Sequence, residues 1–223
     1  MTGLRLARVL FGTTAEGPGL RCAVWVQGCS IRCSGCINPH LFTSRGGEVH
    51  DPVELVNLAV TRGCEGLTIL GGEPFDQAEG CAELAEAGQR AGLGVITFSG
   101  YELKELKARG AGSHRLIEAT DLLVDGPYRA HQPEEKRGLV GSSNQRFLHL
   151  TDRYAQFDPY RHVNRVDVRI SATGQAEVAG FLDGQEVRQL MQLLDARRTT
   201  RSATNFPISA GSDSQTEGVA CQE

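Results

Sequence analysis

Three cysteines lie within eight residues near the start of the chain, at Cys29, Cys33 and Cys36 in the stretch CSIRCSGC. Thiolates bind soft or borderline metals, and in an iron–sulfur cubane each cysteine bonds one iron. A structural zinc site requires four ligands, and no fourth cysteine follows at a comparable spacing. Three thiolates on a four-iron cluster would leave one iron open to a small molecule that carries an amine and a carboxylate. The triplet therefore predicts either such a cluster or a zinc site completed by Cys22 or His40.

Other short stretches carry residue types that could serve a binding site. Gly71-Gly72-Glu73, Ser99-Gly100-Tyr101 and Asp125-Gly126 each follow an apolar run. Glycine lets a ligand or a neighbouring backbone approach closely. Each stretch also has a simpler interpretation. Gly71 and Gly72 could be chosen for the shape of a strand-to-helix turn, with Glu73 favoured by the helix dipole in the first turn. Tyr101 could pack, and Asp125 could be a turn residue rather than a substrate-side acid. Ser142-Ser143-Asn144, in a polar stretch at 129–146 that predicts a long loop, is either a polar turn or a loop that faces a partner or a cofactor.

The elements that must position these residues follow from hydrophobic patterning. Short apolar or alternating runs predict four strands, at residues 21–27, 66–72, 94–100 and 121–126. Helices are predicted from the cap sequence Asp51-Pro52-Val53-Glu54 to Gly63, over 77–91 and over 102–109. Such alternation is typical of a parallel sheet built from βαβ units, in which ligands bind beyond the carboxyl ends of the strands. The cysteine loop and the three glycine-containing stretches all follow strand ends, so we expect them to meet on one face.

The C-terminal third has a different pattern. Residues 165–181 alternate around Thr173-Gly174 and predict a β-hairpin. Residues 184–198 are predicted to be helical, and the Ser/Thr/Gly-rich stretch 199–223 to be disordered. The expected organisation is a core over 1–182, a C-terminal helix over 183–198 and a tail over 199–223.

Composition narrows the class of protein. The chain has 223 residues, of which 40% are hydrophobic and 22% charged, as in one globular domain with or without a tail. The net charge of −4 and the pI near 5.9 argue against nucleic acid or an anionic membrane as a partner. No apolar run reaches the length of about 18 residues that spans a bilayer, and we expect a cytoplasmic protein. In that reducing setting clustered cysteines indicate metal ligands, whereas Cys64 and Cys81 lie in apolar surroundings and are expected in the core.

Five stretches, in a consistent order, resemble the activating proteins of anaerobic ribonucleotide reductase, a family of radical S-adenosylmethionine (SAM) enzymes. They are EGPGLRCAVWVQGCSIRCSGCINPHLF at 16–42, LTILGGEPF at 67–75, FSGYELKEL at 98–106, DLLVDGPY at 121–128 and GSSNQR at 141–146. The first contains the C-x3-C-x2-C spacing of radical SAM enzymes. Many members of that superfamily place an aromatic residue before the third cysteine, whereas Gly35 stands there in this chain, as in the reductase-activase branch. Beside these motifs, zinc becomes the minor interpretation of the triplet.

The resemblance implies a fold, two cofactors and a set of contacts. The fold is α/β, a partial parallel β/α barrel of the radical SAM type that is open on one side, followed by the hairpin, the helix and the tail. Cys29, Cys33 and Cys36 would hold a [4Fe–4S] cluster whose open iron binds the methionine end of SAM. The other implied contacts are Gly71, Gly72 and Glu73 at the methionine amine, Gly35 and Ile37 beside the adenine, and Ser99 and Gly100 under the ribose or sulfonium. Reductive cleavage of SAM would give a 5′-deoxyadenosyl radical that abstracts a hydrogen atom, and no catalytic side chain is assigned.

Three functions remain open. The first is an anaerobic, oxygen-labile activating enzyme that installs a glycyl radical on a partner enzyme and receives electrons from an external flavodoxin- or ferredoxin-type donor. The second is a radical SAM enzyme that acts on a small molecule or peptide, because residues 151–223 extend beyond the resemblance. The third is a non-catalytic iron–sulfur or zinc-binding interaction module, which predicts no SAM binding.

Overall fold

The computed structural model describes residues 3–173, 176–181, 189 and 192 of the chain. The chain divides after Leu182 into two compact units, and the second lies outside the described residues except for positions 189 and 192. The predicted helix at 184–198 and the predicted tail at 199–223 therefore fall almost wholly outside the description. Among the described residues, no helix has the length and apolar character needed to cross a membrane.

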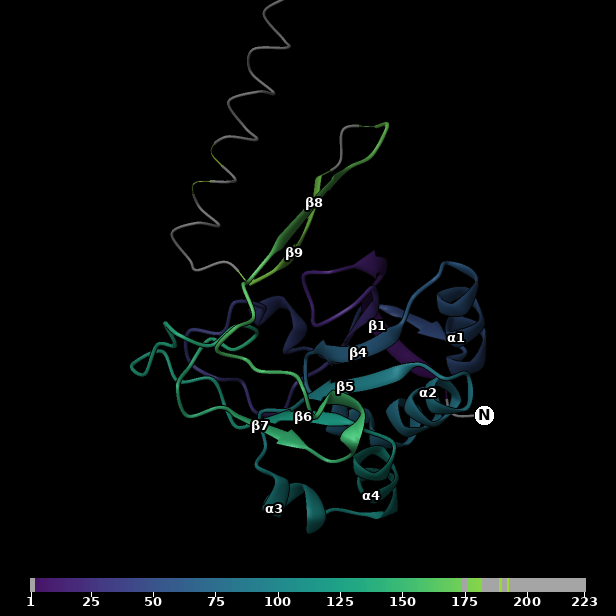
Figure 1. Cartoon of the computed structure of the whole chain (residues 1–223), viewed down its shortest axis with the longest axis horizontal. Coiled ribbons are helices and arrows are strands. Elements are labelled where there is room, and N and C mark those ends of the chain that lie inside the picture. Colours follow the sequence, from purple (N-terminus) through teal and green to yellow (C-terminus); the bar gives the residue numbers. More distant parts are fainter. Residues whose placement is uncertain (1–2, 174–175, 182–188, 190–191, 193–223) are drawn as a thin grey trace, which may run out of the picture. The chain divides into compact units, whose positions relative to one another are not determined.

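A seven-stranded mixed sheet forms the frame of the described core, in the order β3-β1-β2-β4-β5-β6-β7 (Figure 1). The strands are β1 (Leu4–Thr13), β2 (Arg21–Val26), β3 (Glu48–His50), β4 (Gly66–Gly71), β5 (Gly94–Phe98), β6 (Leu122–Asp125) and β7 (Arg146–His149), with β8 (Val166–Ile170) and β9 (Ala176–Gly180) in a separate pair. The central strands β2, β4, β5 and β6 run parallel, whereas β1, β3 and β7 pair antiparallel at the two edges. The predicted α/β class with a parallel central sheet is confirmed.

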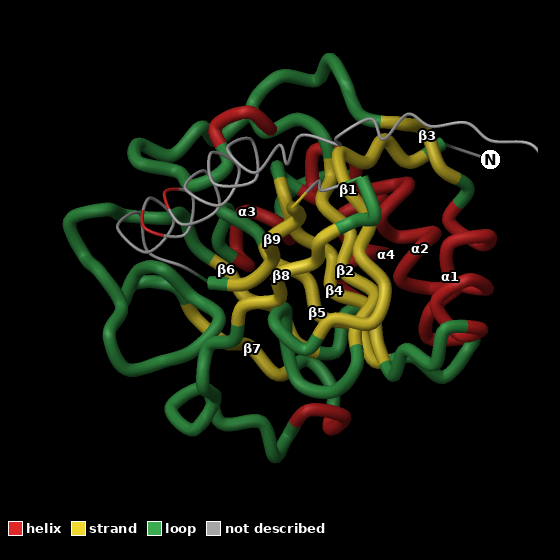
Figure 2. The backbone as a smooth tube through the Cα atoms, turned by 90° about the horizontal axis from the view of Figure 1, so that it is seen from above, coloured by secondary structure: helices red, strands yellow, loops and turns green. Residues whose placement is uncertain are grey.

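Helices α1, α2 and α4 lie side by side along one face of this sheet (Figure 2). The helices are α1 (Pro52–Thr61), α2 (Ala78–Arg90), α3 (Leu103–Lys107) and α4 (Ala111–Glu118), with short 3-10 turns η1 (Pro39–Leu41), η2 (Pro74–Gln77) and η3 (Asp152–Tyr154). The predicted start of α1 is confirmed, because Asp51 Oδ1 accepts hydrogen bonds from the N–H groups of Val53 at 2.8 Å and Glu54 at 3.1 Å.

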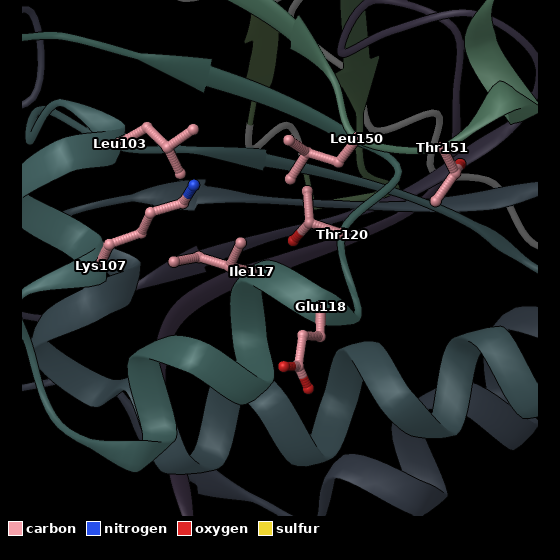
Figure 3. Close-up of a pocket in the computed structure, with 7 residues that line it drawn as sticks. All are labelled: Leu103, Lys107, Ile117, Glu118, Thr120, Leu150 and Thr151. Carbon is pink, nitrogen blue, oxygen red and sulfur yellow. The ribbon is translucent and has the colours of Figure 1, made fainter.

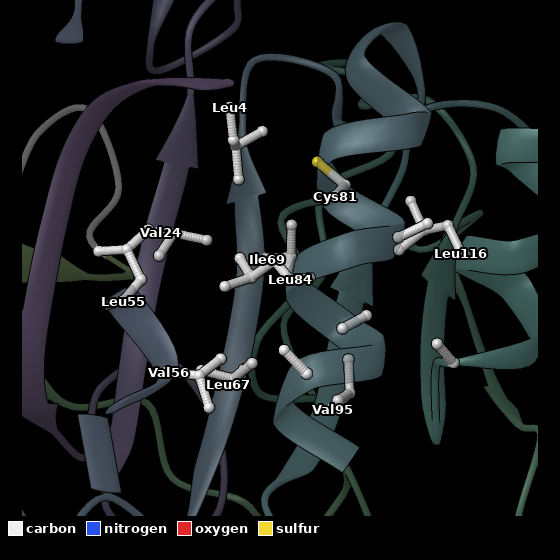
Figure 4. Close-up of a cluster of buried hydrophobic side chains, with 14 of the residues drawn as sticks. Leu4, Val24, Leu55, Val56, Leu67, Ile69, Cys81, Leu84, Val95 and Leu116 are labelled. Atoms are coloured by element: carbon white, nitrogen blue, oxygen red, sulfur yellow. The ribbon is translucent and has the colours of Figure 1, made fainter. Parts of the chain in front are cut away.

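The main hydrophobic core lies between these helices and the sheet (Figure 4). Leu67 and Ile69 alternate on β4 and point to this side, so a strand period of two supplies the buried surface. Cys64 and Cys81 belong to the same cluster, as the sequence predicts, and Cys22 joins them. Burial raises the pKa of the Cys22 thiol to about 12. Burial raises the pKa of Cys81 as well, so Cys22 and Cys81 are protonated packing groups, distinct from the half-buried cysteine loop.

Several elements differ from the prediction. The strands β1, β3 and β7 and the helix α4 were not predicted, although Leu4, Leu6 and Leu10 of β1 are buried with more exposed residues between them. β5 ends at Phe98 rather than at residue 100, and β6 ends at Asp125 rather than at residue 126. Ser99 and Gly100 therefore lie in a loop after β5, whereas Asp125 is the last residue of β6 and pairs with Arg146 of β7.

The strands β8 and β9 pair antiparallel, where the sequence predicts a hairpin. One face of this pair bonds to β1: Arg8 forms an ion pair with Glu177 at 2.8 Å, and Thr13 Oγ1 donates to Asp167 at 2.5 Å. The residues that alternate with Asp167 on β8 are apolar and exposed. Polar contacts therefore link the hairpin to β1, beside the packing of Ala179 in one apolar cluster with Leu10.

Candidate functional site

The cysteine loop follows β2, whose six residues are all buried and fix where the loop begins. Cys29, Cys33 and Cys36 are half-buried and carry free thiols. The backbone turns sharply between them, with φ of +53° at Arg32 and +77° at Gly35. Glycine adopts this left-handed region freely, whereas arginine adopts it at a cost of roughly 1 kcal/mol or more. Strain of this kind in a non-glycine residue is characteristic of functional loops.

Backbone donors surround the first thiol of the triplet. Cys29 Sγ accepts hydrogen bonds from the N–H groups of Ile31 and Arg32, so the strained turn directs two donors at one sulfur. Burial nevertheless raises the pKa of Cys29 above its usual range, and the carboxyl groups of Glu73 and Asp76 add to the rise. Such a thiol keeps its proton unless a metal takes the proton's place.

The other two thiols have donors of the same kind. Cys33 Sγ accepts a hydrogen bond from the N–H of Tyr128, in the segment after β6, and Cys36 Sγ accepts one from the N–H of Asn38 at 3.4 Å. Burial raises the pKa of both thiols. Hydrogen bonds to the sulfurs are among the properties that set the potential of an iron–sulfur cluster. A triplet in which every sulfur has a backbone donor therefore fits a cluster.

The three thiols are not gathered around a single point. Among the residues that the structure describes, no three His, Cys, Asp or Glu side chains are arranged to hold one metal ion. A tetrahedral zinc needs thiolates about 2.3 Å from one centre, whereas a cubane takes each cysteine on a different iron. Cys22 is buried in the core and His40 is exposed, so neither completes a zinc site with the triplet.

Glu73 links the ends of β4 and β5 and is only 1% exposed. Its Oε1 accepts hydrogen bonds from Ser99 Oγ at 2.9 Å and from the N–H of Phe75 at 3.0 Å, and its Oε2 accepts one from the N–H of Gly100 at 2.9 Å. Burial raises the pKa of Glu73 to about 7, and the three donors offset part of that rise. The strand ends therefore converge, as the sequence predicts, on a buried carboxyl group beside the cysteine loop.

Gly71 and Gly72 allow β4 to approach β2 closely. Gly71 has φ of +109°, and a Cβ on it would lie 2.6 Å from Trp25 Cα. A Cβ on Gly72 would lie 2.0 Å from Gly28 O, and the Gly72 N–H donates to Val26 O at 2.9 Å. Backbone packing thus requires glycine at both positions, which is the simpler of the two interpretations open from the sequence.

A polar network connects the cysteine loop to η2 and to the segment after β5. Ser30 donates to Asp76 twice, from its N–H at 2.7 Å and from its Oγ at 2.9 Å, and Ser30 Oγ also lies 2.8 Å from Tyr101 Oη. The Arg109 guanidinium lies 4.4 Å from the centroid of the Tyr101 ring. Tyr101, expected as a packing residue, therefore also bonds to the cysteine loop.

Two predicted positions differ from the rest. The Asp125 side chain is fully buried, forms an ion pair with Arg146 at 2.5 Å, and accepts a hydrogen bond from the N–H of Leu103 at 2.7 Å. Asp125 is thus engaged at the strand end, which favours the turn interpretation over a substrate-side acid. Ile37 is 57% exposed, so its side chain is not packed into the site.

Asp76, Arg109 and Tyr128 were not singled out from the sequence. Ser30 and Asp76 are 46 residues apart in the chain, and no local spacing signals such a contact. Tyr128 stands in the DGPY stretch that contributes to the resemblance, which was the signal available from the sequence. Its contact with Cys33 is seen only in the structure.

A surface pocket is formed by a different set of residues, from α3, α4 and the segment after β7 (Figure 3). It is lined by Leu103, Lys107, Ile117, Glu118, Thr120, Leu150 and Thr151. None of the predicted site residues lines it, and we assign it no part in the site.

Three thiols with backbone donors, at the carboxyl ends of parallel strands and beside a buried carboxyl group, define a protein that holds an iron–sulfur cluster next to a binding site. The chain belongs to the family described as "4Fe-4S single cluster domain", whose model matches residues 15–148. The match spans the cysteine loop and all of the strand ends described above.

Relatives agree with this membership. The chain is 27% identical over 144 residues to the "Anaerobic ribonucleoside-triphosphate reductase-activating protein" of Enterobacteria phage T4, which covers 61% of this chain and 88% of that protein. It is 29% identical over 139 residues to the "Pyruvate formate-lyase-activating enzyme" of Clostridium pasteurianum, over 56% of this chain and 55% of that protein. A crystal structure of QueE from Escherichia coli aligns over 44% of this chain and 52% of that chain, at 14% identity and with a TM-score of 0.35. The predicted resemblance to radical SAM activating proteins is confirmed, and with it the [4Fe–4S] cluster and SAM as the cofactors.

Proposed function

We propose that this protein is a radical SAM enzyme that installs a glycyl radical on a partner enzyme of the anaerobic ribonucleotide reductase type. The observation that supports it most is the convergence of the half-buried thiols with Glu73, Ser99 and Gly100 at one edge of the sheet. The names of the relatives point to the same class of reaction.

The chain's own residues would hold and orient the cofactors. Cys29, Cys33 and Cys36 would bind three irons of the cluster and leave the fourth for the methionine end of SAM. Around SAM we assign Gly71, Gly72 and Glu73 to the amine, Gly35 and Ile37 to the adenine side, and Ser99 and Gly100 to the ribose or sulfonium. The burial of Glu73 supports its assignment, because a carboxylate withdrawn from water gains strongly from a cationic partner.

When bound and reduced, the cluster and SAM supply a 5′-deoxyadenosyl radical that abstracts a hydrogen atom, here from a glycine Cα of the partner. The protein contributes position and a site with little water, and the electron comes from an external flavodoxin- or ferredoxin-type donor. We propose that the sheet belongs to a partial barrel, open on one side, through which a loop of the partner reaches the site. The half-exposed thiols and the exposed Ile37 support such access.

The test is anaerobic reconstitution with iron and sulfide, followed by dithionite and SAM, with 5′-deoxyadenosine as the product measured. We expect cleavage that depends on all three loop cysteines, and a glycyl radical signal when the partner enzyme is added. A partner in which that glycine is replaced by alanine must lose the signal, and persistence of the signal would refute the glycyl target. Stoichiometric zinc with no SAM cleavage would instead indicate a binding module.

A second candidate keeps the radical chemistry but acts on a small molecule or peptide. The hairpin of β8 and β9 favours it, because it lies beyond the matched residues 15–148 yet bonds to β1 through Arg8 and Thr13. Labelled product formed without any partner protein would select this candidate over the first.

A further inference from the structure

Tyr128 contacts the cysteine loop at two points. Its N–H donates to Cys33 Sγ, and its ring lies beside Gly35, where an added Cβ would be 3.5 Å from Tyr128 Cε1 and 3.2 Å from Ala130 Cβ. Gly35 also has φ of +77°, so the loop offers only backbone at this position. The side chain that packs against the loop between the second and third cysteines therefore comes from the segment after β6.

The other edge of the same ring faces a second glycine. A Cβ on Gly141 would lie 3.1 Å from Tyr128 Cε2 and 3.3 Å from Cδ2. Gly141 begins the turn over residues 141–145, which we name the bracket turn. The ring of Tyr128 is thus in contact with the cysteine loop on one edge and with the bracket turn on the other.

The bracket turn also bonds to the backbone on both sides of Tyr128. Asn144 Nδ2 donates to Pro127 O at 2.8 Å, and the N–H of Arg129 donates to Ser142 Oγ at 3.1 Å. These two hydrogen bonds fix the residue before and the residue after Tyr128. They therefore determine where both the N–H and the ring of Tyr128 point.

Gln145 in turn gives the bracket turn its shape. Its Oε1 accepts hydrogen bonds from the N–H groups of Gly141 and Ser142, each at 3.1 Å. The sequence leaves this polar stretch open as a turn or as a loop that faces a partner or a cofactor, and the structure shows its side chains bonded within the chain. Their hydrogen bonds lead from one loop, through Tyr128, to a thiol of the site.

We infer that Tyr128 is a positioning residue for the cysteine loop and that the bracket turn holds it in place. The inference rests on the proposed function only in that the loop carries the cluster, because every contact in it is made by the chain itself. Without the ring, Gly35 loses one of the two side chains that lie beside it, the other being Ala130, and the loop opens more often. The hydroxyl of Tyr128 has no part in these contacts.

Hydrogen exchange of the full-length, iron-free protein, followed by mass spectrometry, tests this directly. In Tyr128→Ala we expect peptides covering residues 29–38 to exchange about tenfold faster, as a local opening without global unfolding. Peptides from β4 and β5 serve as internal controls and are expected to exchange at the wild-type rate. Tyr128→Phe keeps the ring and should restore wild-type exchange in the loop.

Asn144→Ala tests the contribution of the bracket turn while the ring of Tyr128 is kept. It also provides a test if Tyr128→Ala does not fold. We expect it to speed exchange of the same loop peptides by about threefold, since one of two flanking hydrogen bonds is lost. In reconstituted protein, Tyr128→Ala should release iron to a chelator several-fold faster than Tyr128→Phe.

Loop exchange that is unchanged in Tyr128→Ala, or equally fast in Tyr128→Phe and Tyr128→Ala, would overturn the inference. Absence of an effect in Asn144→Ala would overturn the role of the bracket turn. A wild-type protein that fails to cleave SAM would refute the proposed function without altering these exchange results, so the two failures are distinguishable.

Discussion

The strands β4 and β5 have glycine at or near both ends. The groups that occupy the space beside these glycines differ between the two ends. At the amino ends, a Cβ on Gly66 would lie 2.0 Å from Arg21 Nη1, and one on Gly94 would lie 2.3 Å from Tyr154 Oη. These glycines make room for two large side chains. Arg21 is 1% exposed, and its guanidinium donates to Thr68 Oγ1 at 3.0 Å and to Gly94 O at 3.1 Å, with Leu67 O and Tyr154 Oη also bonded. The amino ends are closed by a buried, fully engaged cation.

At the carboxyl ends, the space beside the glycines is filled by the backbone of β2 and by the cysteine loop instead. Gly71 and Gly72 bring β4 against β2, and a Cβ on Gly100 would lie 2.6 Å from Ile31 Cδ1 of the cysteine loop. The side chain enclosed there is Glu73, and the thiols beside it remain half-exposed. A glycine at a strand end is therefore no sign of a binding site by itself. Whether a strand end is closed or accessible depends on which groups pack beside the glycine.

The largest expected difference between the two ends is in activity. Cys33→Ala removes a ligand from the carboxyl end and should lower SAM cleavage by about 100-fold or more, because a residue that bonds the iron directly matters at least as much as the groups that support it. Cys81→Ala in the core should leave cleavage per folded molecule unchanged and lower the free energy of unfolding by about 1–2 kcal/mol. Assays of 5′-deoxyadenosine and urea denaturation measure the two effects. Equal losses of cleavage in both variants would contradict the separation of loop thiols from core thiols.

The amino end should show the opposite pattern. Arg21→Met leaves several buried acceptors without a donor, and we expect the free energy of unfolding to fall by about 2–4 kcal/mol despite the relief of burying a cation. Cleavage of SAM per folded molecule should stay at the wild-type level, because Arg21 lies at the far ends of the strands from the thiols. Urea denaturation gives the first quantity, and the cleavage assay at low temperature gives the second. A variant as stable as wild type but inactive would refute the comparison.

The sequence predicts the parallel centre of the sheet better than it predicts the strands on either side of that centre. The parallel strands were predictable because each is a short apolar run that ends at glycine, and the start of α1 because Asp51 and Pro52 form a local cap. The strand β1, which lies between β3 and β2, was missed because its alternation of buried Leu4 and Leu6 is brief and is followed by the half-buried Arg8 and Val9. Periodicity reports burial, and β1 is only partly buried.

Contacts between distant residues account for the rest of what was missed. The cysteine spacing and Glu73 could be singled out from the sequence, because ligand type and position at a strand end are local properties. The hydrogen bonds of Ser30 with Asp76 and of Tyr128 with Cys33 join segments far apart in the chain. Arg21 illustrates the same limit, because a lone arginine at the start of a strand gives no hint that carbonyl oxygens of two other strands will enclose it.

Two buried carboxyl groups extend the comparison to pH. Burial raises the pKa of Glu16, which accepts a hydrogen bond from the N–H of Gly180 at 2.7 Å, and of Glu73 to about 7 in each case. The folded protein therefore binds these protons more tightly than the unfolded chain does. Their contribution to stability is fully present below the unfolded pKa of 4.5 and is lost as pH rises through the folded pKa near 7. Each group accounts for at most about 3 kcal/mol of this loss.

Urea denaturation at pH 5 and pH 8 checks this sign. Glu16→Gln and Glu73→Gln should each reduce the fall in unfolding free energy between the two pH values, whereas Glu118→Gln, at an exposed position of α4, should leave it unchanged. A wild-type protein that becomes more stable from pH 5 to pH 8 would contradict the assignment of both groups.

The smallest expected effect is a release of protons on SAM binding, which should involve Glu73 and not Glu16. If Glu73 meets the methionine amine, the ammonium should lower its pKa, so that SAM binding at pH 7 releases about half a proton per molecule. Calorimetric titration of the reconstituted protein in two buffers of different ionisation enthalpy measures this release. Glu73→Gln should abolish it, and Glu16→Gln should preserve it, because Glu16 bonds to the hairpin rather than to the strand ends. SAM binding without any proton release would mean that Glu73 does not contact the methionine amine. The stretch from Gly71 to Glu73 would then have only the packing role that Gly71 and Gly72 already show.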